Sequence, residues 1–179
     1  MNKLKLILVL SLLSIVCSAQ NTEWTVTSSK IKFKIKNAGF MVDGEFGGLV
    51  AKINFDAAKS YSNHIEAEVE SKTLNTDNDS RDKHLKKEDY FSVEKFPTIS
   101  MSASTFAKQP DKSYKGYFKL TLKGVTKDIV IPFTFIESDN TAEIVGTFKF
   151  NRREYGVGES SIILSDNVTL MINVKLTKK

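Results

Sequence analysis

The chain has 179 residues, of which 41% are hydrophobic and 26% are charged, and its formal net charge is +5. This length and composition are enough for one domain with a hydrophobic core. Basic residues alternate with apolar ones instead of forming a continuous stripe, which argues against nucleic-acid binding. Cys17 is the only cysteine, which excludes an internal disulfide.

The N-terminal segment has the layout of a secretory signal peptide. Two lysines precede an apolar run at residues 6–16, and small residues follow it. We therefore expect residues 1–19 to be removed as a signal peptide and residues 20–179 to form a single domain that is periplasmic or secreted. Cys17 leaves lipidation open as an alternative to cleavage after Ala19.

Most of the remaining chain alternates apolar and polar side chains with the period of a half-buried β-strand. Residues 30–36, for example, place Ile31, Phe33 and Ile35 on one face and lysines on the other. The same alternation predicts strands at residues 24–27, 30–36, 45–56, 64–73, 99–103, 114–123, 128–137, 142–152 and 168–177.

The interval from residue 74 to 104 differs, because it is polar and compatible with a helix. Short polar side chains at residues 77–80 are able to accept hydrogen bonds from the first backbone N–H groups of a helix. We expect a short helix over about residues 79–90, held to the sheet by an aromatic anchor at residues 90–96. Pro97 then restricts Phe96 to an extended conformation and starts the next strand.

About eight strands with one apolar face each, joined mostly by short turns, predict an all-β antiparallel fold. Closure into a barrel covers the apolar faces and removes unpaired edges. A two-sheet sandwich is the alternative. The alternation slips between Phe46 and Leu49, and Gly47–Gly48 is where a β-bulge would absorb the slip.

Residues suited to catalysis or metal binding are sparse. His64 and His84 are the only histidines, and no cysteine is available to complete a zinc site. A metal site formed by Asp79, Asp82 and His84 is an alternative to a solvated cluster at the helix start. The sequence has no G-x-S-x-G motif, so we expect no catalytic residues, no metal and no cofactor.

The interior of the barrel remains as the candidate site. Gly116 and Gly146 fall at inward positions and withdraw side-chain volume, which favours a hollow interior over a filled one. A wholly apolar interior suits a hydrocarbon chain. The alternation predicts that the interior is lined by Phe33, Ile35, Phe46, Phe55, Val69, Phe91, Met101, Phe118, Leu120, Ile131, Phe133, Phe148, Phe150, Leu170 and Ile172.

Five segments together resemble the YceI-like polyisoprenoid-binding proteins over nearly the whole mature chain. They are FKIKNAGFMVDGEF, RDKHLKKEDYFSVEKFPTISMSAS, KGYFKLTLKGVTKDIVIPF, FKFNRREYGVG and LSDNVTLMINVKL. The resemblance implies a periplasmic or secreted lipocalin-like barrel that holds a long isoprenoid lipid without catalysis or metal. Asn37 and Ser28 depart from the pattern, because the family often has histidine there.

These observations lead to the expectation of a non-enzymatic carrier or store for an amphipathic isoprenoid such as a polyprenyl phosphate or quinone. Arg81 and His84 are candidate headgroup contacts, and the alternative is a helix cap with surface charge. We expect transient contact with a membrane surface, no nucleic-acid partner, and a monomer or homodimer. The rival functions are a structural or stress protein with a filled core, and an enzyme acting on a lipid or quinone through His84 and Asp82.

Overall fold

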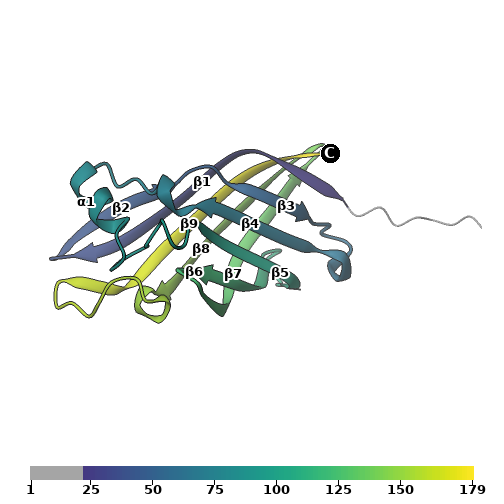
Figure 1. Ribbon diagram of the computed structural model, residues 1–179. Helices are drawn as coiled ribbons and strands as arrows, with labels where there is room; N and C mark the ends of the chain where they lie inside the picture. Colours follow the sequence, from purple (N-terminus) through teal and green to yellow (C-terminus); the bar gives the residue numbers. More distant parts are fainter. Residues whose placement is uncertain (1–21) are drawn as a thin grey trace, which may run out of the picture.

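The computed structural model describes residues 22–179, so the predicted signal peptide and Cys17 lie outside it. Strands dominate the described chain, and Figure 1 shows them wrapped around a common axis. They are β1 (Glu23–Asn37), β2 (Phe40–Phe46), β3 (Val50–Asn54), β4 (His64–Glu70), β5 (Thr98–Lys108), β6 (Tyr114–Leu122), β7 (Val125–Ser138), β8 (Thr141–Asn151) and β9 (Leu164–Lys178). The helices are α1 (Asp79–Leu85) and the 3₁₀ turns η1 (Ser60–Ser62), η2 (Ser71–Thr73) and η3 (Arg152–Tyr155).

The sheet closes into an antiparallel barrel because β1 pairs with β9 along almost its whole length. On its other edge, β1 pairs with β2 near its C-terminal end and with β3 at its N-terminal end. Strands β2 and β3 therefore occupy one position in the barrel, which then has eight strands. The predicted fold class is confirmed, and the sandwich alternative is wrong.

Strand β1 is longer than the alternation predicts. It joins the two predicted strands at residues 24–27 and 30–36, because a register shift between Val26 and Ser28 absorbs the change of parity. It turns into β2 through Ala38 and Gly39, whose φ values of 47° and 89° suit a tight hairpin.

The helix begins where expected but ends earlier. The Asn78 side chain accepts a hydrogen bond from the Arg81 backbone N–H, 2.9 Å away, and caps the first turn. The helix ends at Leu85, because the Phe91 N–H donates to the Leu85 carbonyl at 3.0 Å and the chain folds back. Packing of the partly buried Phe91 against Phe46 thus accompanies the end of the helix before the helix-forming residues 86–89.

The wall of the barrel opens between β2 and β4. The predicted bulge at Gly47–Gly48 is a complete break between β2 and β3, because β3 continues along β4 while β2 diverges from it. Glu45 and Asn75 exchange two backbone hydrogen bonds, of 2.8 and 3.0 Å, on the edge of β2 that β4 leaves free. The segment leading into α1 therefore closes the gap through its backbone.

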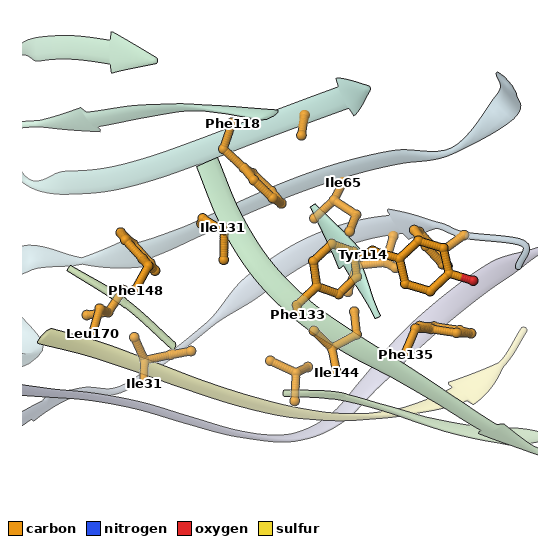
Figure 2. Packing of buried hydrophobic residues seen from close by; sticks show 14 of the residues in the cluster. Ile31, Ile65, Tyr114, Phe118, Ile131, Phe133, Phe135, Ile144, Phe148 and Leu170 are labelled. Atoms are coloured by element: carbon orange, nitrogen blue, oxygen red, sulfur yellow. The ribbon is translucent and has the colours of Figure 1, made fainter. Parts of the chain in front are cut away.

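An aromatic plug fills the end of the barrel farther from α1. The Phe55 ring, 1% exposed, lies 4.6 Å from the ring centroid of Phe135 and 5.1 Å from that of Tyr114. Phe133 stacks on Tyr114 at 5.5 Å, and Figure 2 shows these rings close to Ile144. Trp24 adds an edge-to-face contact with Phe135 at 5.5 Å. Such dense aromatic packing fixes this half of the barrel.

Arg152 fixes the long connection between β8 and β9. Its guanidinium group is 3% exposed and donates to the carbonyls of Val157, Glu159 and Ser165 at 2.7 to 2.9 Å. It also forms an ion pair with Asp166 at 3.1 Å. One buried cation therefore satisfies several loop carbonyls that would otherwise lose water without a partner.

Tyr155 packs nearby, and its hydroxyl has no hydrogen-bond partner within the described chain. The residue is 1% exposed and its ring lies edge-on to Phe150 at 5.6 Å. Burial, and secondarily the charge of Glu154, raises the pKa of Tyr155 above its ordinary value.

Replacing Arg152 with methionine should lower the free energy of unfolding by about 3 kcal/mol, because buried carbonyls lose their donor. Denaturant unfolding of the purified variant measures this. Arg153→Met is the control, because Arg153 is half exposed and reaches Asp166 only at 3.6 Å; it should cost less than about 1 kcal/mol. Equal losses of unfolding free energy in the two variants would contradict the role assigned to Arg152.

Replacing Tyr155 with phenylalanine should raise the free energy of unfolding by about 1 kcal/mol, because the buried hydroxyl is unsatisfied. The stability advantage of the phenylalanine variant over wild type should grow above pH 10. The unfolded tyrosine ionises at a lower pH than the folded one, whose pKa is raised, so wild type loses stability relative to the variant as the pH rises. Unfolding curves at pH 8 and pH 10.5 test this, with the exposed Tyr117→Phe as control.

Candidate functional site

A cavity of about 270 Å³ lies between the aromatic plug and the segment that carries α1. The inward faces of the strands form its wall, and Leu85 and Phe91 cover it from the α1 side. Phe91 packs edge-on against Phe46 at 5.6 Å. The barrel is therefore filled at one end and hollow at the other.

Most side chains predicted for the interior border this cavity. They are Phe33, Ile35, Phe46, Val69, Phe91, Met101, Phe118, Leu120, Ile131, Phe133, Phe150, Leu170 and Ile172. Whether they contact a ligand remains a prediction, but the structure brings them together around one empty space.

Phe55 and Phe148 point inward but do not border the cavity, which corrects their placement. Phe55 is enclosed in the plug by Phe106, Tyr114 and Phe135. Phe148 is 6% exposed, and its ring centroid lies 6.0 Å from that of Phe150. Phe150 borders the cavity, whereas Phe148 does not. Alternation identifies the inward face of a strand, but neighbouring rings decide which inward side chains meet empty space.

The two inward glycines differ in their surroundings. Gly146 borders the cavity, as expected from its missing side chain. A Cβ atom at Gly116 would lie 2.4 Å from the Phe118 ring, so that ring occupies the space. The expectation that Gly116 helps to keep the interior hollow is wrong, because Gly116 allows a large neighbour to pack closely.

The sequence reasoning missed two kinds of lining residue. Ile31, Ala51, Ala67 and Ile144 lie on inward faces that the alternation identified, so the pattern was sufficient to find them. A second set lies in segments that the alternation did not assign to strands: Asn37, Val42, Thr76, Leu85, Tyr90, Val157 and Leu164. Leu49 lies in the break between β2 and β3, where the alternation slips.

Polar lining groups include Thr76, Arg81, His84 and Arg152, which come from the α1 segment and η3. The Arg81 Nε donates to the Thr76 hydroxyl at 2.8 Å, and its Nη2 donates to the Thr76 carbonyl at 2.6 Å. No hydrogen bond of the described chain uses its Nη1. Arg81 thus stabilises the entry to α1 and keeps one donor group for another molecule.

The structure does not form the acid–base pair considered for His84 and Asp82. The Asp82 carboxylate accepts hydrogen bonds from the Thr76 backbone N–H at 3.0 Å and from the Thr76 hydroxyl. The exposed His84 instead lies edge-on to Tyr90 at 4.9 Å. Among residues 22–179, no three His, Cys, Asp or Glu side chains form a group able to hold a metal ion.

The resulting site is an apolar cavity beneath a polar and partly charged cover. Such an arrangement suits a molecule with a hydrocarbon tail and a polar head. No helix in the described part of the chain has the length and apolar character needed to span a bilayer.

Comparison with known proteins places the chain in a family. The profile of the YceI-like domain matches residues 24–176. A UPF0312 protein of Pseudomonas fluorescens is 32% identical over 161 residues, which cover 83% of this chain and 81% of that protein. A UPF0312 protein of Shewanella denitrificans is 27% identical, covering 84% and 83% of the two chains.

Solved structures share the barrel. The YceI protein of Campylobacter jejuni superposes with a TM-score of 0.71 at 27% identity, covering 77% of this chain and 85% of that one. BcnA of Burkholderia cenocepacia gives 0.79 at 20% identity, covering 82% and 95%.

A polyisoprenoid-binding domain from Saccharophagus degradans gives a TM-score of 0.69 at 13% identity, covering 89% of this chain and 99% of that one. At 20% and 13% identity, the second and third of these structures support the shared fold alone. The profile match spans nearly all of the described barrel and the curated relatives align over most of their length, so this chain belongs to the YceI-like family.

Proposed function

We propose that this protein binds an amphipathic isoprenoid lipid, with its tail in the cavity and its headgroup beneath the α1 segment. The observation that carries the proposal is the apolar cavity that Arg81 and Thr76 border on the α1 side. Membership of the YceI-like family, together with the shared fold of a polyisoprenoid-binding domain, supports the choice of an isoprenoid. The protein would act as a non-enzymatic carrier or store outside the cytoplasm.

Affinity would come mainly from the tail. Removing apolar surface from water is worth about 25 cal/mol per Å², and ordering costs reduce the gain. No directional bond to the tail is required, which is consistent with the apolar wall.

The length of the bound tail depends on the cover. Ligand pockets usually measure about 300 to 1,000 Å³, and the cavity of about 270 Å³ lies just below that range. A long prenyl chain therefore requires the α1 segment to move outward. Strands β1 and β9 cannot make this movement, because continuous pairing holds them.

Replacing Ala67 with phenylalanine should lower uptake of decylubiquinone and farnesyl phosphate at least tenfold. Ala67 borders the cavity, and a benzene-sized ring needs about 150 Å³, more than half of the space. Ligand titration followed by native mass spectrometry measures the bound fraction.

The control for Ala67→Phe is Ala107→Phe, since Ala107 pairs with Lys115 on the outer face of β5 and β6. It should bind both probes like wild type. Two results together would favour the rival structural role: protein from its native source carries no extractable lipid, and the wild-type protein takes up neither probe.

Replacing Arg81 with glutamine should weaken binding of farnesyl phosphate about tenfold, because a hydrogen bond to a charged group is worth about 1.5 to 3 kcal/mol. Binding of neutral farnesol should change less than twofold. Lys83→Gln, on the exposed side of the same helix, should affect neither. An equal loss for phosphate and alcohol would mean that Arg81 only supports Thr76.

A further inference from the structure

Large apolar side chains gather without cover at the end of the molecule that carries α1. Phe40 and Met41 follow the β1–β2 turn and are 78% and 57% exposed. Ile162 and Ile163, just before β9, are 106% and 62% exposed. Exposed apolar groups gathered in this way mark an interaction surface.

These two segments form one structure, which we call the lip (residues 38–41 and 162–164). The Ala38 N–H donates to the Ile163 carbonyl at 2.8 Å, and Asn37 pairs with Leu164. Figure 1 shows both segments at the same end of the barrel, with the C-terminus at the other end.

The lip is continuous with the cavity wall. Asn37 and Leu164 border the cavity. Phe40 lies directly opposite Asn37 in the β1–β2 pairing, so it shares the inward face of the sheet just beyond the cavity. A tail leaving the cavity over this edge would meet the apolar lip before it met water.

Lysines lie behind the lip on the outer face. Lys36 pairs in register with Met41, and Lys34 and Lys149 flank Thr169 on the same face. All three are exposed, and within residues 22–179 only Lys34 forms an ion pair, with Asp43 at 3.4 Å. Apolar side chains in front of exposed lysines complement a bilayer with anionic headgroups.

We propose that the lip docks on the surface of an anionic bilayer, with Phe40, Met41 and Ile162 entering the interface and Lys36 contacting headgroups. Docking would place the edge of the cavity at the membrane. This inference rests on the proposed function for its purpose, but membrane binding is measurable whether or not the cavity holds an isoprenoid.

Phe40→Trp provides a direct test. The chain has a single tryptophan, Trp24, which is 2% exposed in the plug, so the new indole reports on the lip. Vesicles of phosphatidylcholine with 30% phosphatidylglycerol should shift its emission to the blue. Ile136→Trp, at a site 60% exposed on β7, should show no shift. A shift from both sites, or from neither, would overturn the proposal.

Vesicle sedimentation of the protein without the tryptophan substitutions tests the apolar contribution and the charge contribution separately. Phe40→Ser with Ile162→Ser should reduce the bound fraction at least tenfold, and Lys36→Gln should reduce it about fivefold on anionic vesicles only. Equal binding to pure phosphatidylcholine would overturn the charge component. A wild-type dimer in solution that these serine substitutions dissociate would assign the lip to self-association instead.

Discussion

The need to pair backbone groups along the edge of β2 determines how this barrel is built. A closed sheet satisfies its N–H and C=O groups by closure, but β2 does not pair with β4, because the strand breaks at residues 47–49 and only β3 continues along β4. Asn75 pairs with Glu45 through the backbone, and the Thr73 hydroxyl accepts a hydrogen bond from the Gly47 N–H. The opening in the wall and its α1 cover are therefore one feature.

The aromatic plug supplies the packed core that stabilises the barrel despite this opening in its wall. Side chains around Phe55 bury their surface at the far end and hold β6, β7 and β1 together without help from the open side. A domain of this size needs such a core, since an interior that was hollow throughout would lose too many contacts. Stability and the candidate binding site thus occupy different halves of the same barrel.

Periodicity was sufficient to predict the fold and most of the wall, because inward and outward positions on a strand differ by one residue. Phe33 and Leu170 border the cavity as their parity predicts. Phe148 does not, although it has the same parity, because its ring packs beside that of Phe150, which borders the cavity. Leu164 and the end of α1 at Leu85 were not predictable, because long-range contacts with β1 and Phe91 determine them.

The two sides of the cavity entrance differ in the number and kind of contacts that hold them to the barrel. On the lip side, Arg152 bonds several carbonyls of the β8–β9 connection, and β1 and β9 pair up to Leu164. On the α1 side, the Gly158 N–H bond to the Asp89 carbonyl and the Phe46–Phe91 contact are among the few links to the rest of the barrel. Moving residues 79–91 outward would break these two contacts and leave the Glu45–Asn75 pairing in place, whereas moving the lip would break a strand ladder. A ligand that needs more than the existing volume would therefore enter beneath α1 while the lip keeps its position.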